Sequence, residues 1–99
     1  MQYIYFLHNR KSIAMIRNWK KDNYHLSTDK SKLKPDIIHT YLKNSYWAKG
    51  IPMEIVHHSI ENSLCFGIYF EFEQVGFARL ITDYSTFAYL ADVFVLEPH

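Results

Sequence analysis

The chain has 99 residues, of which 48% are apolar and 17% aromatic, which is enough for one compact hydrophobic core and excludes two. The net charge of +1 gives no whole-chain reason to expect nucleic acid or an anionic membrane as a partner. The charges are nevertheless uneven, because residues 1–50 hold ten of the eleven basic residues and residues 51–99 hold seven of the ten acidic ones, so the two halves can attract each other.

The amino-terminal segment, residues 1–14, is patterned differently from the rest of the chain, and Met15 makes a natural start for the better-patterned part. We therefore expect an extension over 1–14 and a single domain over 15–99. Within this domain, the alternation from Tyr24 to Ser27 predicts a short strand that leaves into a polar loop.

Two helices are predicted next. Pro35 suits a first helical turn, and a run of apolar residues comes after it at helical spacing, with Gly50 as a stop after Tyr46 and Trp47. Pro52 and Glu54 open the second helix. Its inward face is expected to hold Ile51, Ile55, Val56, Ser59 and Ile60, and its outward face His57, His58, Glu61 and Asn62.

From Leu64 onward the apolar period changes to two. Three strands are predicted, Leu64 to Phe70, Gln74 to Thr82 and Phe87 to Leu96, and the connections of about four residues make neighbours antiparallel. The fold class is therefore α+β: a short strand, two helices and an antiparallel three-strand meander. The last strand is apolar on both faces, which is typical of a strand in the middle of a layered domain, yet no later segment of this sequence is left to cover its second side.

Asp92 is the only charged residue in that last apolar run and needs a partner or water. If Asp83 to Thr86 forms the turn, Arg79 faces Leu90 and Asp92 lies diagonally on the same face. A structural Arg79–Asp92 pair is then a simpler interpretation than a catalytic base, and both interpretations stay open.

No metal site is expected, because adjacent His57 and His58 point about 100° apart on a helix and no further ligand motif accompanies them. Cys65, the only cysteine, is expected in the core rather than as a nucleophile, and it excludes an intrachain disulfide. Together with the lack of a long apolar run, this favours a cytoplasmic protein without membrane contact. Lys30, Lys32 and Lys34 are interpreted as solvated surface, not as a nucleic-acid site.

The order strand, helix, helix and meander, with the segments YHLSTDKSKL, NSYWAKGIP, SLCFGIY, QVGFARLITD and TFAYLADVFVLEPH, resembles the GCN5-related N-acetyltransferase (GNAT) family from about Met15 to His99. In that family the last meander strand leads into a glycine-rich loop that binds the pyrophosphate of acetyl-CoA at a helix amino terminus. The resemblance therefore implies the amino-terminal half of such a domain, with the phosphate loop expected just after His99.

The resemblance also implies roles for individual residues. The main chain of Val93, Phe94 and Val95 would bind the pantetheine arm or the acetyl oxygen, and Asp92 would act as a direct or water-mediated base. Tyr46, Trp47 and Arg79 would contact the acceptor, although the two aromatic residues are also suited to packing a helix against the sheet.

Two functions are therefore hypotheses for this chain. The first is transfer of an acetyl group from acetyl-CoA to a primary amine of a small molecule or protein, by direct attack of the amine on the thioester. The second is a non-catalytic module that buries its open strand edge against another copy, forming a homodimer.

Overall fold

The computed structural model describes residues 16–99, and the predicted extension over 1–14 lies outside them. The elements, in chain order, are β1 (Asn18–Lys21), β2 (Tyr24–Ser27), the 3-10 helix η1 (Lys30–Lys32), α3 (Pro35–Lys43), α4 (Met53–Glu61), β3 (Leu64–Phe70), β4 (Glu73–Thr82) and β5 (Ala88–Val95). The five strands form one antiparallel sheet in sequence order, β1-β2-β3-β4-β5. The predicted α+β class and the antiparallel meander are confirmed.

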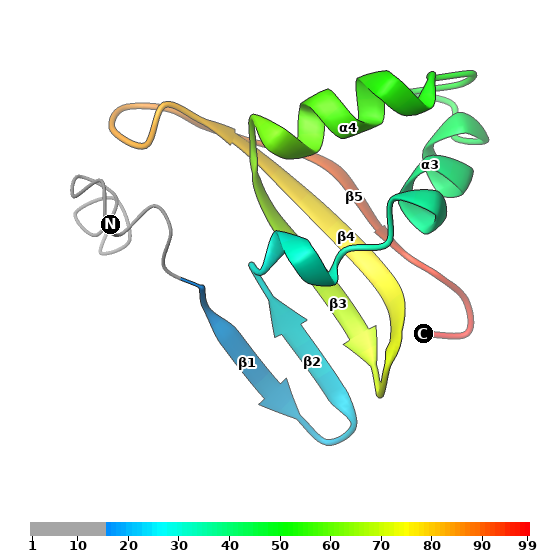
Figure 1. The fold of residues 1–99 in the computed structure, drawn as a ribbon, viewed down its shortest axis with the longest axis vertical. Helices are drawn as coiled ribbons and strands as arrows, with labels where there is room; N and C mark the ends of the chain where they lie inside the picture. Colours follow the sequence, from blue (N-terminus) through cyan, green and yellow to red (C-terminus); the bar gives the residue numbers. More distant parts are fainter. Residues whose placement is uncertain (1–15) are drawn as a thin grey trace.

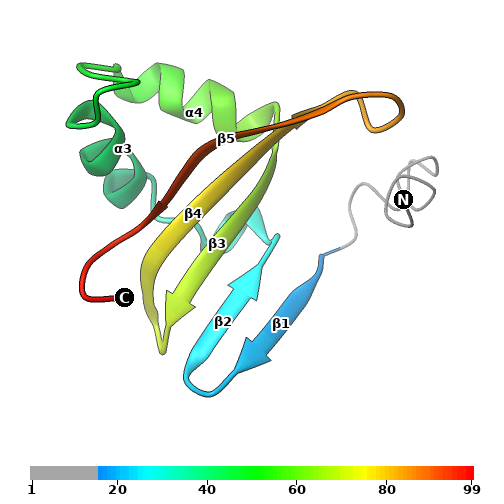
Figure 2. The same ribbon diagram turned by 180° about the vertical axis from the view of Figure 1, so that it is seen from behind.

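The helices lie over one face of the sheet, beside β3, β4 and β5, whereas the β1–β2 hairpin extends beyond them (Figure 1). Seen from behind, the sheet shows its other face, which none of the helices in residues 16–99 covers (Figure 2). None of these helices is long and apolar enough to cross a bilayer.

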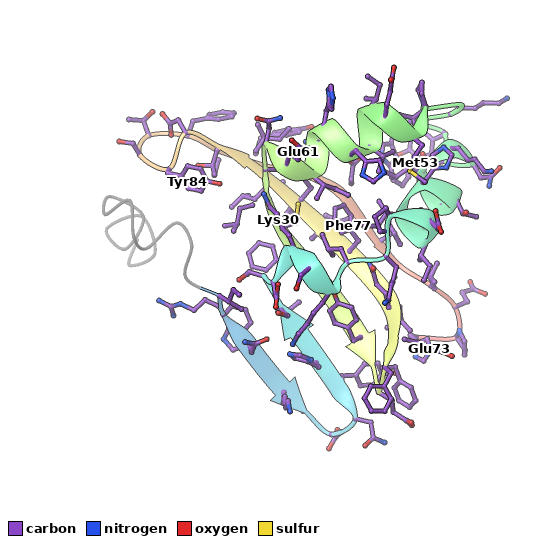
Figure 3. The ribbon with its side chains drawn as sticks, viewed as in Figure 1. Lys30, Met53, Glu61, Glu73, Phe77 and Tyr84 are labelled. Atoms are coloured by element: carbon purple, nitrogen blue, oxygen red, sulfur yellow. The ribbon has the colours of Figure 1, made fainter. Side chains whose placement is uncertain are left out.

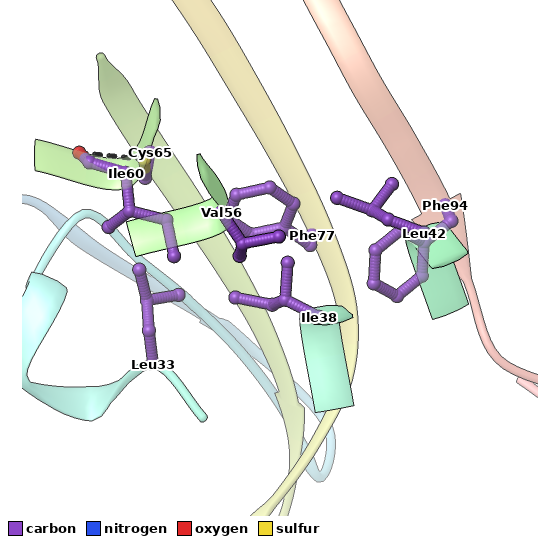
Figure 4. Close-up of a cluster of buried hydrophobic side chains, with 8 residues drawn as sticks. All are labelled: Leu33, Ile38, Leu42, Val56, Ile60, Cys65, Phe77 and Phe94. Atoms are coloured by element: carbon purple, nitrogen blue, oxygen red, sulfur yellow. Dashed lines mark hydrogen bonds between the residues drawn. The ribbon is translucent and has the colours of Figure 1, made fainter. Parts of the chain in front are cut away.

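The hydrophobic core fills the space between the two helices and the sheet (Figure 4). Each helix supplies two fully or nearly buried side chains one turn apart, Ile38 with Leu42 and Val56 with Ile60. The remaining core side chains come from the strands and from the residue after η1: Cys65, Phe77, Phe94 and Leu33. Phe77, on β4, lies beneath the helices (Figure 3).

The first helix is shorter than predicted, because it ends at Lys43 instead of continuing toward Gly50. The Ser45 hydroxyl donates to the carbonyl of Leu42 at 2.7 Å and accepts from the amide of Ala48 at 3.1 Å, so it competes with the helical hydrogen bonds. Gly50 does adopt a left-handed conformation, with φ of 76°, and its amide bonds to the carbonyl of Lys43. The glycine therefore closes the loop after the helix and is not the helix stop.

The second helix agrees with its prediction except at one position. Val56 and Ile60 are buried, and His57, His58, Glu61 and Asn62 are exposed. Ile55, which was expected on the inward face, is exposed. At the end of this helix the Lys30 ammonium of η1 donates to the carbonyl of Glu61 at 3.1 Å, which joins η1 to α4 (Figure 3).

Strand β1 was not predicted. It pairs with β2 through a two-residue turn, Asp22 and Asn23, in which Asp22 has φ of 56°. The second tight turn, Glu71 and Phe72, has the same feature, with Glu71 at φ of 56°, and it leaves Phe72 exposed. A positive φ at the first turn residue alone is the pattern of a type II′ hairpin turn.

Candidate functional site

A bulge near the end of β5 sets the geometry of the candidate site. Phe77 pairs with Phe94 and Arg79 with Ala91, so two β5 residues, Asp92 and Val93, stand opposite the single residue Ala78. Asp92 has φ of 53°, a conformation that glycine favours and that aspartate tolerates better than most residues. The strand therefore bends at the only charged residue that it contains.

The pairing of β4 with β5 differs from the predicted pairing of Arg79 with Leu90. The loop between β4 and β5 has five residues, because Thr82 pairs with Ala88, and Arg79 therefore faces Ala91 and not Leu90. The Asp83 carboxylate holds this longer loop: it accepts hydrogen bonds from the amides of Ser85, Thr86 and Phe87 at 2.8–3.0 Å. These bonds, led by that from the Thr86 hydroxyl, lower the pKa of Asp83 well below its ordinary value.

Asp92 is the centre of a hydrogen-bonded group that joins three parts of the chain. Its Oδ2 accepts from Nε of Arg79 on β4 at 2.9 Å, and its Oδ1 accepts from the indole Nε1 of Trp47 at 2.9 Å. Arg79 also donates through Nη1 to the hydroxyl of Ser63 at 3.0 Å. The structure thus contains the Arg79–Asp92 ion pair that the sequence favoured, and it is the only ion pair within 4.0 Å among residues 16–99.

This group fastens the loop after α3 to β5. Both oxygens of Asp92 are engaged, but a carboxylate offers about four lone-pair sites, so acceptor capacity remains for a proton or a water. The Asp92 side chain is only 11% exposed, which limits the directions from which an amine can approach. Its role as a base stays a prediction, and its role in holding Trp47 is observed.

An aromatic groove adjoins this group. The ring of Tyr41, from α3, stacks on Phe94 of β5 with centroids 4.0 Å apart, and Trp47 packs edge-on against Tyr46 at 5.2 Å. Tyr41, Tyr46 and Trp47 border an open hollow of about 920 Å³ that continues along α3 to Leu96. Tyr46 is 92% exposed, so the expectation that it packs helix against sheet is wrong, and it is instead available to a ligand.

The predicted cofactor strand presents one edge to the outside. A hydrogen bond of 2.7 Å from the Leu96 amide to the Val75 carbonyl, and the pairing of Phe94 with Phe77, direct the main chain of Phe94 and Leu96 toward β4. Because main-chain groups alternate along a regular strand, those of Val95, between these two residues, point to the opposite side. No other strand of residues 16–99 pairs with that side.

The side chains of this strand are correspondingly exposed. Phe94 is buried in the core, whereas four other large apolar residues of the strand are exposed: Tyr89, Leu90, Val93 and Val95. Phe87, just before the strand, is exposed as well. The sequence favoured a central position for a strand with two apolar faces. Within residues 16–99 the strand lies at the edge of the sheet, with the open second side that the sequence also indicated.

Two participants were not among the predicted site residues. Tyr41 was recognised only as part of an apolar helix face, and its stacking on Phe94 depends on the tertiary structure. Ser63, the Arg79 partner, is buried between α4 and β3, and no motif marks it. A single serine before a strand gives no sequence signal of this kind.

Other candidate groups lie apart from this site. Burial raises the pKa of the Cys65 thiol to about 11, which suits a core residue and not a nucleophile at neutral pH. Among residues 16–99, no three His, Cys, Asp or Glu side chains gather as metal ligands would.

Comparison with known proteins places this geometry in a class. No family model matches the sequence. A protein of Gibberella zeae with the name "Putative acetyltransferase" is 33% identical over 108 aligned positions, which cover 89% of this chain and 61% of that protein. A crystal structure from Xanthomonas campestris pv. campestris, described as a putative acetyltransferase belonging to the GNAT family, is 49% identical with a TM-score of 0.77, over 81% of this chain and 57% of the other.

The fold is thus that of an α+β domain similar to acetyltransferases. Over the part that aligns, the chain is similar to a protein of the GNAT family, the family that its sequence resembles. It spans 61% and 57% of the lengths of the two relatives.

Proposed function

We propose that this chain binds the acyl end of acetyl-CoA along the open side of β5 and supports transfer of the acetyl group to a primary amine. The observation that carries the proposal is the outward main chain of Val95 beside the bulge at Asp92, next to the aromatic groove. The open edge of a strand presents a row of unpaired amide donors and carbonyl acceptors. The amide groups of a pantetheine arm have the matching donors and acceptors.

In this proposal the thioester supplies the acetyl group, and the chain supplies position and charge. An amide of Val93 or Val95 would donate to the acyl oxygen, where negative charge develops during attack by the amine. The C–N bond forms as the C–S bond of the thioester breaks. Asp92, or a water that it holds, would accept the proton that the amine loses, and CoA would leave as a thiolate that takes up a proton to become the free thiol. Tyr46 and Trp47 would form the acceptor side, with Trp47 fixed by its bond to Asp92.

In this proposal Arg79 has a different role from the contact with the acceptor that the resemblance implied. Its Nε is bonded to Asp92 and its Nη1 to Ser63, and the side chain is only 16% exposed. We infer that Arg79 orients Asp92 and does not contact the acceptor. These contacts do not distinguish an acceptor amine on a small molecule from one on a protein.

Calorimetric titration of the chain with acetyl-CoA tests the proposal. Saturable binding is expected, and a negative charge beside the open edge, Val95→Glu, should weaken it by about tenfold. Tyr89→Glu is the matched control, because Tyr89 is exposed on the same strand near the distant loop and should leave the affinity unchanged. The absence of saturable heat at millimolar acetyl-CoA would contradict the proposal.

A second function is favoured by the exposed apolar side chains of β5. An edge strand with unpaired main chain and several exposed apolar side chains is a template for pairing with another strand. The occupant proposed here is the β5 of a second copy, which would form a symmetric dimer. Sedimentation at several concentrations should then show a dimer that Val93→Lys dissociates, and a monomer at the highest concentration would refute it.

A further inference from the structure

A hollow of about 720 Å³ lies at the opposite end of the sheet from β5. Its floor is a row of side chains across three strands, because Lys20 of β1 pairs with His25 of β2 and His25 pairs with Tyr69 of β3. Tyr69 is buried on the sheet face that carries η1 and the helices. The segment of η1 and the residues after it form one wall, with Ser31, Lys32 and Lys34.

The cations of this hollow have no partners in the part of the chain that the structure describes. Lys20, Lys32 and Lys34 are all exposed, and none of their ammonium groups forms an ion pair within 4.0 Å or a hydrogen bond there. The half-buried ring of His25 has a lowered pKa, first because of burial and then because of Lys32 and Lys20, so its charged form is disfavoured. Three lysines, one from β1 and two from the segment of η1 and the residues after it, thus border one concave surface.

The floor also includes a tyrosine whose hydroxyl is buried without a partner and lies over Gly67 of β3. The Oη of Tyr69 is the only buried side-chain polar atom of residues 16–99 without a hydrogen-bond partner, and the same residue forms part of the floor. Burial, with a smaller contribution from Asp29, raises the pKa of Tyr69 to about 12, so the hydroxyl keeps its proton as a donor. Buried polar groups are rarely left unpaired unless a ligand or water pairs with them.

Carboxylates limit the kind of ligand that fits. Asp22 and Glu71 border the hollow as well, but both belong to the hairpin turns at one end, which the bond from the Glu71 amide to the Asn23 carbonyl holds together. An extended polyanion would have to pass these acids. A compact anion beside the lysines would not.

We propose that this hollow binds a compact, multiply charged anion that carries phosphate groups, separately from the site at β5. Lysine ammonium groups bind phosphate as point charges, and three of them around one hollow match two or more negative charges. The site needs no segment of β4 or β5.

Titration with inorganic pyrophosphate at low ionic strength tests this proposal. Saturable binding is expected, and the combined substitution Lys20→Ala, Lys32→Ala and Lys34→Ala should weaken it by about tenfold or more, because two or three charge-assisted contacts are lost. The matched control replaces Lys21, Lys43 and Lys49 by alanine, which removes the same charge from exposed positions outside the hollow. The control should keep its affinity within about twofold.

Two results would overturn the proposal: no saturable binding at millimolar pyrophosphate, or equal weakening by both triple variants, which would indicate attraction to net charge alone. Thermal melting of both variants checks the fold. If the hollow variant does not fold, Lys20→Ala and Lys34→Ala alone must each weaken binding more than Lys21→Ala does, or the proposal fails. Because pyrophosphate has no acyl group, a negative result leaves the β5 proposal standing.

Discussion

Asp92 illustrates how one residue combines strain, charge and position. Its φ of 53° bends β5, while its carboxylate holds Arg79 and Trp47. The sequence showed that a charge in an apolar strand needs a partner and pointed to Arg79. The register predicted from it was wrong, because nothing in the residue types shows that the loop between β4 and β5 has five residues and not four.

Removing the charge of Asp92 should destabilise the fold. Asp92→Asn keeps the shape, an acceptor for Trp47 and a tolerance of positive φ, but it leaves the largely buried Arg79 without its ion pair. A loss of about 1–3 kcal/mol in the free energy of unfolding is expected from urea titration. The control Glu97→Gln, at an exposed acid without such contacts, should change it by less than about 0.5 kcal/mol. Equal effects of the two variants would refute this role.

Asp83 gives a prediction about pH. Hydrogen bonds from Thr86, Ser85 and Phe87 lower its pKa in the folded protein below the ordinary 3.8, so its stabilising contribution is complete above that value and is lost as the pH falls toward the folded pKa. Asp83→Ala should therefore be less stable than the unmodified chain at pH 7. The gap should narrow below about pH 4. Urea midpoints measured from pH 7 to pH 2.5 check this, and a gap that does not change with pH would contradict it.

At the scale of elements, the second helix and the three meander strands could be predicted almost to the residue, because their apolar periods are unbroken and their connections are short. Strand β1 was missed. Its four residues are all exposed, so no apolar alternation marks them, and the only signal was the turn pair Asp22 and Asn23 between polar segments. The early end of α3 depends on the Ser45 hydroxyl, whose bond to the Leu42 carbonyl is visible only in the structure.

The turn between β3 and β4 is a position where a substitution should stabilise the fold. Glu71 has φ of 56°, which costs a residue with a Cβ more than it costs glycine. Glu71→Gly should raise the free energy of unfolding by about 0.5–1 kcal/mol, measured by urea titration. Phe72→Gly, at the neighbouring turn position without a positive φ, should give no such gain. The interpretation of this turn would be wrong if both glycines stabilised the chain alike.

At the scale of the whole molecule, the sheet is unevenly covered. Helices α3 and α4 pack on one face, the β1–β2 hairpin extends beyond them, and β5 is left with an open side in the described part of the chain. The sequence indicated the layers and the open strand. It did not indicate either hollow, because each is lined by residues from distant segments that only the tertiary structure brings together.

The central claim is that the open side of β5 binds acetyl-CoA. The chemical shifts of the amides of β5 test this claim directly. In a titration followed by nuclear magnetic resonance, the amides of Val93 and Val95 should shift saturably with acetyl-CoA, while those of His57 and His58 on the exposed face of α4, outside both proposed sites, should stay in place. Shifts confined to residues outside β5 and the aromatic groove, or no shifts at all, would contradict the claim.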